Sequence, residues 1–153
     1  MSSAAEPAPD ERPATRWRPR KTVEQMVEEA KGRIQNLSIG QLQAELAGGG
    51  VQLLDIRDVR ERQALGWIPG ALHVPRGMLE FWVDPTSPYY RGRVDPEKRI
   101  VLYCAAGGRS ALAADVLREM GFPDVAHLEV GFTGWSAAGM PTEKPEVTEK
   151  DPQ

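Results

Sequence analysis

The chain of 153 residues contains one cysteine, Cys104, and the residues around it are typical of a reactive thiol. The cysteine ends the apolar run "RIVLYC" and is followed by the small-residue loop "AAGG" and by Arg109. Gly107 and Gly108 tolerate positive φ values, so the backbone can turn tightly and point its N–H groups at an anion. The helix expected to begin near Arg109 adds the positive end of its dipole. We therefore expect Cys104 to be substantially ionised at neutral pH and to act as a nucleophile.

Residues near this loop are candidates for binding an anion or for ordering the site. Arg109 offers charged donors to an anionic substrate, whereas Ser110 either caps the helix or donates to the loop. Asp55 ends an earlier apolar run, and we expect it to order the loop rather than to act as an acid or base, because a carboxylate beside the sulfur disfavours the thiolate. The backbone amides of the loop come from four small residues, Ala105, Ala106, Gly107 and Gly108.

Other polar residues are weaker candidates. Arg76 is a possible second site for binding the anion, although a solvated surface charge is the simpler interpretation. His73 and His127 lie in apolar runs without a second ligand at metal-binding spacing, so we expect both to pack with satisfied hydrogen bonds. We predict no metal site and no cofactor.

The elements that must position these residues follow from hydrophobic periodicity. Buried strands are predicted at residues 51–56, 70–75, 99–104 and 124–130. Helical patterns alternate with these strands, at residues 37–50, 58–66, 76–82, 109–122 and 131–139. This alternation predicts an α/β fold with a mainly parallel central sheet and helices on both faces. Cys104 then lies at the carboxyl edge of the sheet, where such folds place their sites.

The composition divides the chain into four parts. Residues 1–21, rich in Ala, Pro and Arg, predict a disordered N-terminal arm, and residues 141–153, charged and broken by prolines, predict a disordered tail. Residues 22–36 predict an accessory amphipathic helix, since they open with Thr22 in a capping-box pattern. Residues 37–140 contain the alternating elements and form one domain of ordinary size.

Charge and composition exclude several classes of protein. A net charge of −3 gives no general attraction to nucleic acid or to an anionic membrane, and no apolar run approaches the length of a membrane span. The first residues lack the apolar segment of a secretion signal, and a single cysteine fits a reducing compartment. We expect a cytoplasmic protein that binds neither nucleic acid nor membrane.

Four ordered motifs resemble those of the single-domain rhodaneses, the thiosulfate- or persulfide-using sulfurtransferases. The loop "CAAGGRS" resembles the active-site loop of that family, and three further stretches resemble its other motifs: "LLDIRDVRE", "GWIPGALHVP" and "EVGFTGWSAAGMP". The motifs occur in the family's order and cover residues 37–140. The resemblance implies a rhodanese-like three-layer fold extended by the extra N-terminal helix.

The resemblance also implies a two-step sulfur transfer. Cys104 attacks the outer sulfur of an anionic donor, thiosulfate or a persulfide, and holds that sulfur as a persulfide. It then passes the sulfur to cyanide or to a thiol acceptor, which is a small molecule or a protein. In this scheme Arg109 binds the sulfonate or sulfite group and Arg57 is structural. Monomer and homodimer remain open.

Two other functions stay as alternatives at this point. One is a binding or sulfur-relay module with little turnover of small molecules. The other is a cysteine-dependent phosphatase, which the loop disfavours, because four residues separate Cys104 from Arg109 and the phosphatase pattern has five. An arsenate reductase that needs a second cysteine in the chain is excluded by the cysteine count.

An aromatic segment, residues 78–93, extends the domain between two predicted strands. Its four aromatic residues either form a lid over Cys104 that restricts the donor or pack only the outer core: Phe81, Trp82, Tyr89 and Tyr90. The helix at residues 22–36 either covers the domain or supports a dimer.

Overall fold

The computed structural model describes residues 15–146, and these residues form an α/β domain around one parallel sheet. The five strands of the described region lie in the order β1-β5-β4-β2-β3, and every pair between neighbours is parallel. Their bounds are β1 (Gln35–Leu37), β2 (Val51–Asp55), β3 (Leu72–His73), β4 (Arg99–Tyr103) and β5 (Val125–Leu128).

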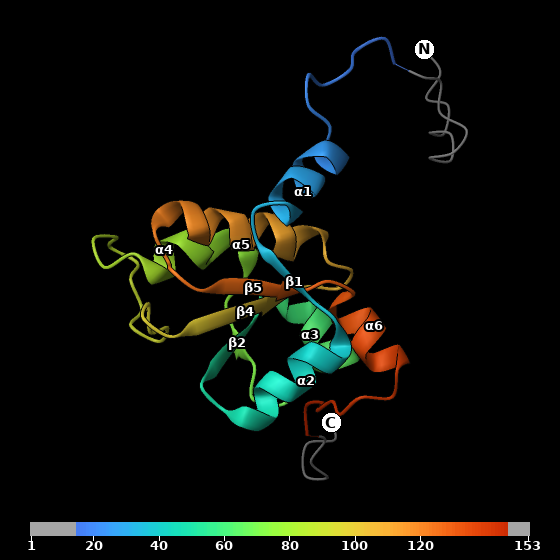
Figure 1. Cartoon of the computed structure of the whole chain (residues 1–153), viewed down its shortest axis with the longest axis vertical. Helices are drawn as coiled ribbons and strands as arrows, with labels where there is room; N and C mark the ends of the chain where they lie inside the picture. Colours follow the sequence, from blue (N-terminus) through green and yellow to red (C-terminus); the bar gives the residue numbers. More distant parts are fainter. Residues whose placement is uncertain (1–14, 147–153) are drawn as a thin grey trace, which may run out of the picture.

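Helices cover both faces of this sheet, which confirms the predicted fold class. One face carries α1 (Val23–Lys31), α4 (Leu79–Val83) and α5 (Gly108–Met120), with the short 3-10 helix η2 (Arg76–Met78) leading into α4. The other face carries α2 (Ile39–Gly48), α3 (Val59–Leu65) and α6 (Gly131–Ala137) (Figure 1). In residues 15–146 no helix is both long and apolar enough to span a membrane.

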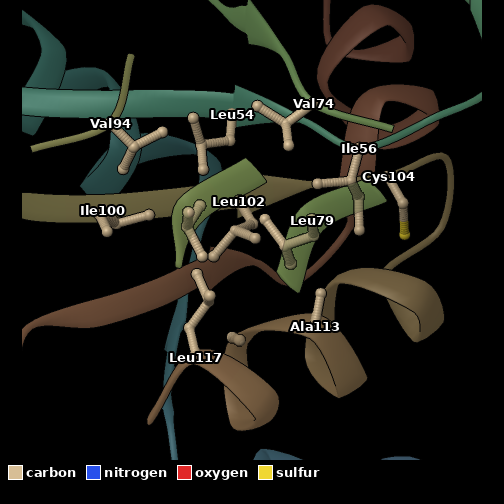
Figure 2. Packing of buried hydrophobic residues seen from close by; sticks show 12 residues of the cluster. Leu54, Ile56, Val74, Leu79, Val94, Ile100, Leu102, Cys104, Ala113 and Leu117 are labelled. Carbon is tan, nitrogen blue, oxygen red and sulfur yellow. The ribbon is translucent and has the colours of Figure 1, made fainter. Parts of the chain in front are cut away.

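The alternation of side chains along β4 builds two cores, one on each face. Ile100 and Leu102 point into the core under α4 and α5, and Cys104 continues their row just beyond the strand (Figure 2). Val101 and Tyr103 point into the opposite core, which α2 and α6 cover. Since successive side chains of a strand face opposite ways, this register decides which groups can reach the sulfur.

The N-terminal helix is shorter than its sequence pattern predicted. The capping box of Thr22 forms as expected, but the helix ends at Lys31, with Gly32 as its C-cap. The residues that follow form β1, which pairs with β5 and adds an edge strand to the sheet. The prediction of helix up to residue 36 was therefore wrong in its last turn, because sheet pairing determines the structure of so short a strand.

Contacts between α1 and α5 show that this helix covers the domain. Arg33, just after α1, forms a bidentate ion pair with Asp115 of α5, with N–O distances of 2.9 and 2.7 Å. Val27 lies close to Gly108, the first residue of α5, so that a Cβ atom at Gly108 would be 3.9 Å from its methyl group. The accessory segment thus reaches the end of α5 that adjoins Cys104.

The prediction of a disordered tail was wrong for residues 141–146. Glu143 forms an antiparallel bridge to Trp67, with two backbone hydrogen bonds of 2.8 Å each, and accepts a further bond from the indole nitrogen of Trp67. The indole of Trp135 donates to the carbonyl of Pro141 at 2.8 Å. The predicted N-terminal arm, up to residue 14, and the tail from residue 147 lie outside the described residues.

The structure does not support the aromatic lid. Tyr90 lines a pocket with Pro96, which precedes β4, and with Met120 and Phe122, which lie at and just after the end of α5. Because β4 runs toward Cys104 and α5 runs back from it, this is the edge of the sheet opposite the cysteine (Figure 1). Phe81 and Tyr89 pack edge to face, with ring centroids 6.1 Å apart. Phe81, Tyr89 and Tyr90 are thus exposed outer residues, whereas Leu79 and Val83 of the same segment are buried in the core under α4 and α5.

Candidate active site

The thiol of Cys104 lies at the bottom of the loop between β4 and α5, with only 1% of the residue exposed. Two backbone N–H groups donate to its Sγ atom, that of Gly107 at 3.1 Å and that of Ser110 at 3.3 Å. The first turn of α5 begins at Gly108, so the positive end of a 13-residue helix adjoins the sulfur. Amide dipoles in this position favour negative charge on a sulfur atom, and the ionisation of Cys104 stays our prediction.

The N-terminus of α6 explains why the loop amides point at the sulfur. The N–H of Phe132 donates to the carbonyl of Cys104 at 2.8 Å, and that of Thr133 donates to the carbonyl of Ala105 at 3.0 Å. Because the carbonyls of Cys104 and Ala105 both bond to α6, the N–H groups later in the loop point the other way, toward Sγ. Gly131 allows the approach, because its φ is +68° and a Cβ atom there would lie 2.3 Å from the oxygen of Ala105.

Arg109, in the first turn of α5, forms an ion pair that the sequence did not reveal. Its guanidinium contacts both carboxylate oxygens of Glu61, from α3, at 3.0 Å each, and its side chain is 43% exposed. The hydrogen bonds to Glu61 raise the pKa of Arg109. Arg109 is therefore anchored to α3, and its guanidinium, with five N–H groups, keeps donors for an anion.

Asp55 and Arg57 lie on the other face of the sheet from the sulfur. Asp55 accepts hydrogen bonds from the guanidinium of Arg57 at 3.0 and 2.8 Å and from the hydroxyl of Tyr103 at 2.9 Å, and all three residues are buried. Burial, with the charge of Asp55, raises the pKa of Tyr103. This network ties the end of β2 to the end of β4 directly below the loop. A direct role of Asp55 at the sulfur is thus excluded, and an ordering role remains our prediction.

Ser110 and His127 lie on the same face as Cys104. Ser110 Oγ is 3.5 Å from the Sγ atom and 2.8 Å from His127 Nδ1, and His127 Nε2 is 2.8 Å from Asn36 Oδ1. The hydroxyl does not cap α5, whose N-cap is Gly107. His127 is buried with both ring nitrogens bonded, as expected, but sequence reasoning missed that one of its partners contacts the cysteine. A lone histidine in the strand beside β4 was the available signal.

The remaining candidates have partners of their own. Arg76 pairs with Glu80 of α4 at 2.8 Å, and His73 Nε2 contacts the carbonyl of Arg57 at 2.7 Å. Among residues 15–146, no three metal-ligating side chains come together.

The environment of His127 predicts a pH dependence of stability. Burial, reinforced by Lys31, lowers the pKa of His127 to about 4. Below about pH 6.5 His127 becomes protonated in the unfolded chain but not in the folded chain. The contribution of His127 to the free energy of unfolding is therefore fully present above that pH and decreases as the pH drops. We expect the free energy of unfolding to fall by about 2 kcal/mol between about pH 7.5 and 5.

Urea unfolding of wild type and His127→Phe across that range checks this dependence. The variant should lose most of the slope, whereas His73→Phe should retain it. An equal slope in wild type and His127→Phe would contradict the assignment to this residue.

Comparison with known proteins identifies the family to which this site belongs. A model of the rhodanese-like domain matches residues 38–138. The chain belongs to the rhodanese-like family. Its relatives include the thiosulfate sulfurtransferase GlpE of Shewanella oneidensis, 33% identical over 103 residues that cover 67% of this chain and 93% of the relative. The human thiosulfate:glutathione sulfurtransferase is 29% identical over 105 residues, covering 65% of this chain and 90% of the relative.

Solved structures with this rhodanese-like fold carry different descriptions. A protein from Rhodopseudomonas palustris CGA009 is 41% identical with a TM-score of 0.79, covers 85% of this chain and 100% of its own, and is described as of unknown function and a possible tyrosine phosphatase. The polysulfide-sulfur transferase homodimer of Wolinella succinogenes is 30% identical with a TM-score of 0.60, covering 81% of this chain and 88% of its own.

Proposed function

We propose that this rhodanese-like protein is a sulfurtransferase that moves a sulfane sulfur through a persulfide on Cys104. The observation that carries the proposal is the buried thiol with two backbone amides directed at its sulfur, beside the start of a long helix. Such a site favours an anionic sulfur. The names of the relatives, thiosulfate and polysulfide sulfurtransferases among them, support the same reaction class.

The chemistry requires two displacements at sulfur. The Cys104 thiolate forms a bond to the outer sulfur of the donor, and the donor's own sulfur bond breaks, so that sulfite leaves thiosulfate with the electron pair. An acceptor thiolate, having lost its proton to solvent, then attacks the outer sulfur of the persulfide. The acceptor becomes a persulfide and the Cys104 thiolate is restored.

The mass of the intact protein tests the proposal. After incubation with thiosulfate or with a low-molecular-weight persulfide, the protein should gain the mass of one sulfur atom, and cyanide or a thiol should remove it. Since Cys104 is the chain's only cysteine, protein alkylated beforehand is the matched control and should gain nothing. Loading only by a protein-bound persulfide would indicate the sulfur-relay module, and no loading by any sulfur donor would overturn the proposal.

The same experiment includes a phosphatase substrate as a separate arm. The description of the Rhodopseudomonas palustris structure motivates this arm, but the four residues between Cys104 and Arg109 make a shorter loop than the phosphatase pattern has. We expect no phosphate release and no phosphorylated protein. Release of phosphate that alkylation of Cys104 abolishes would favour the phosphatase instead.

Arg109 and Glu61 should affect thiosulfate use in opposite directions. Arg109→Gln removes the cation beside the sulfur and should lower kcat/KM for thiosulfate about tenfold, whereas Glu61→Gln frees the guanidinium and should lower KM. Steady-state assays over a range of thiosulfate concentrations measure both. Arg118→Gln is the matched control, because Arg118 lies at the other end of α5 and pairs with Asp115 at 2.9 Å. Equal losses in Arg109→Gln and Arg118→Gln would exclude a role in donor binding.

A further inference from the structure

A chain of polar groups connects the cysteine to the N-terminal segment. It runs from Cys104 Sγ to Ser110 Oγ at 3.5 Å, to His127 at 2.8 Å, and to Asn36 at 2.8 Å. Cys104, Ser110 and His127 are at most 1% exposed. Asn36 belongs to β1, outside the residues that the family model matches. The chain therefore joins the candidate nucleophile to the part of the molecule that starts with α1.

The hydrogen atoms of this chain have one consistent arrangement. The amide nitrogen of Asn36 contacts the carbonyls of Lys31 at 3.0 Å and Ile34 at 3.4 Å, and only an N–H group can donate to a carbonyl. The amide oxygen of Asn36 therefore faces His127, and Nε2 of the histidine must donate to it. A neutral imidazole carries one hydrogen, so Nδ1 of His127 is an acceptor.

Ser110 then has one hydrogen and competing acceptors. His127 Nδ1 is the closest at 2.8 Å, and the carbonyl of Gly107 is farther away at 3.3 Å. With its hydrogen on Nδ1, the hydroxyl presents a lone pair to the sulfur. A neutral Cys104 thiol can donate its S–H to that lone pair, but a thiolate has nothing to donate. The arrangement favours the protonated cysteine, in opposition to the loop amides.

We propose that His127 is a positioning residue that holds the Ser110 hydrogen away from Cys104 in the resting protein and thereby restrains ionisation of the nucleophile. On ionisation the thiol proton leaves to solvent. The Ser110 hydrogen stays on its oxygen and turns from Nδ1 to Sγ. Asn36 fixes the direction of the imidazole, so the segment of α1 and β1 sets the reactivity of the thiol. The inference rests on the proposed function only in taking Cys104 as the nucleophile.

Charged groups near both ends of the chain are consistent with a neutral His127. Burial has the largest effect on the imidazole and lowers its pKa. Lys31 of α1 lowers the pKa further and Glu129, after β5, raises it, so that the pKa of His127 falls to about 4. The histidine thus remains an acceptor across the neutral range. Arg109, paired with Glu61, is the charge beside Cys104, and it is present in every variant used below.

The rate of iodoacetamide alkylation as a function of pH tests the inference, since the chain has no other thiol. In His127→Phe the Ser110 hydroxyl is free to donate to the thiolate, so the midpoint of the profile should move down by about one pH unit. In Ser110→Ala that donor is absent, and the double variant Ser110→Ala/His127→Phe should match Ser110→Ala. His73→Phe should match wild type, because the His73 ring contacts the backbone carbonyl of Arg57 and is not part of this polar chain.

Two results would overturn the inference. One is a folded His127→Phe whose midpoint equals or exceeds that of wild type. The other is a shift by His127→Phe that persists in the Ser110→Ala background. Neither measurement uses a sulfur donor, so each is independent of the proposed transferase activity.

Nitrogen-15 NMR of the wild-type histidines tests the same inference without a substitution, should a variant not fold. His127 should carry its hydrogen on Nε2 and remain neutral down to about pH 5. A hydrogen on Nδ1 would overturn the arrangement.

Discussion

Replacing Cys104 with Ser should abolish sulfur loading and lower turnover with any sulfur donor by at least about a thousandfold. A serine hydroxyl is not ionised at neutral pH and cannot hold the transferred sulfur in a stable S–S bond. The loop itself should remain, because the amides of Gly107 and Ser110, which bond to Sγ, can donate to a serine oxygen equally well. Intact mass and steady-state turnover give the comparison.

A thermal unfolding scan is the control for Cys104→Ser. Wild type and variant should unfold at similar temperatures, since the change removes little volume from the buried site. Substantial turnover by a folded Cys104→Ser would mean that another group carries the sulfur, and the two-displacement scheme would then fail.

Replacing Arg57 with Met should produce the largest loss of stability, about 3–5 kcal/mol in the free energy of unfolding. Arg57 and Asp55 are both fully buried and form two hydrogen bonds, and a third bond joins Arg57 to the carbonyl of Gly66 at 2.6 Å. Removing the guanidinium leaves the Asp55 carboxylate buried without its main partner. Urea unfolding at neutral pH measures this loss.

The matched control for Arg57→Met is Arg60→Met, three residues further along the chain. Arg60 pairs with Asp58 at 3.3 Å, but its side chain is 87% exposed, so stability should stay nearly unchanged. The double variant Asp55→Asn/Arg57→Met should recover part of the loss, because both charges of the buried pair are then removed. Recovery should be partial, since Arg62, 3.7 Å from Asp55, also loses its partner. Equal stability of Arg57→Met and wild type would contradict a structural role for the pair.

The predicted aromatic lid over Cys104 conflicts in part with the order of the elements in the sequence. The lid hypothesis placed Tyr89 and Tyr90 over the cysteine, although the segment enters β4 and the cysteine leaves it. The crossover into β4 leaves β3 at the carboxyl edge and reaches β4 at the amino edge, so its last residues lie far from Cys104. The order of elements therefore already argued against placing Tyr89 and Tyr90, which come late in the crossover, over the cysteine.

Sequence alone determined the α/β class, the small-residue loop after β4 and the position of Cys104 at the carboxyl edge, because these depend on residues close together in the chain. Hydrophobic periods of strand and helix, small residues after the strand, and Arg109 one turn later are local signals. The capping box of Thr22 was local in the same sense and formed as the pattern predicted.

Tertiary structure decided the features that join distant residues. The bond of His127 to Asn36 spans 91 positions, the pair of Arg109 with Glu61 spans 48, and Trp67 meets Glu143 across 76. No pattern in the chain selects such partners, since each is fixed by which strands pair and by which face of the sheet a side chain points to. For that reason the sequence singled out Cys104 as the candidate nucleophile, and only the folded chain showed which side chains lie against its sulfur.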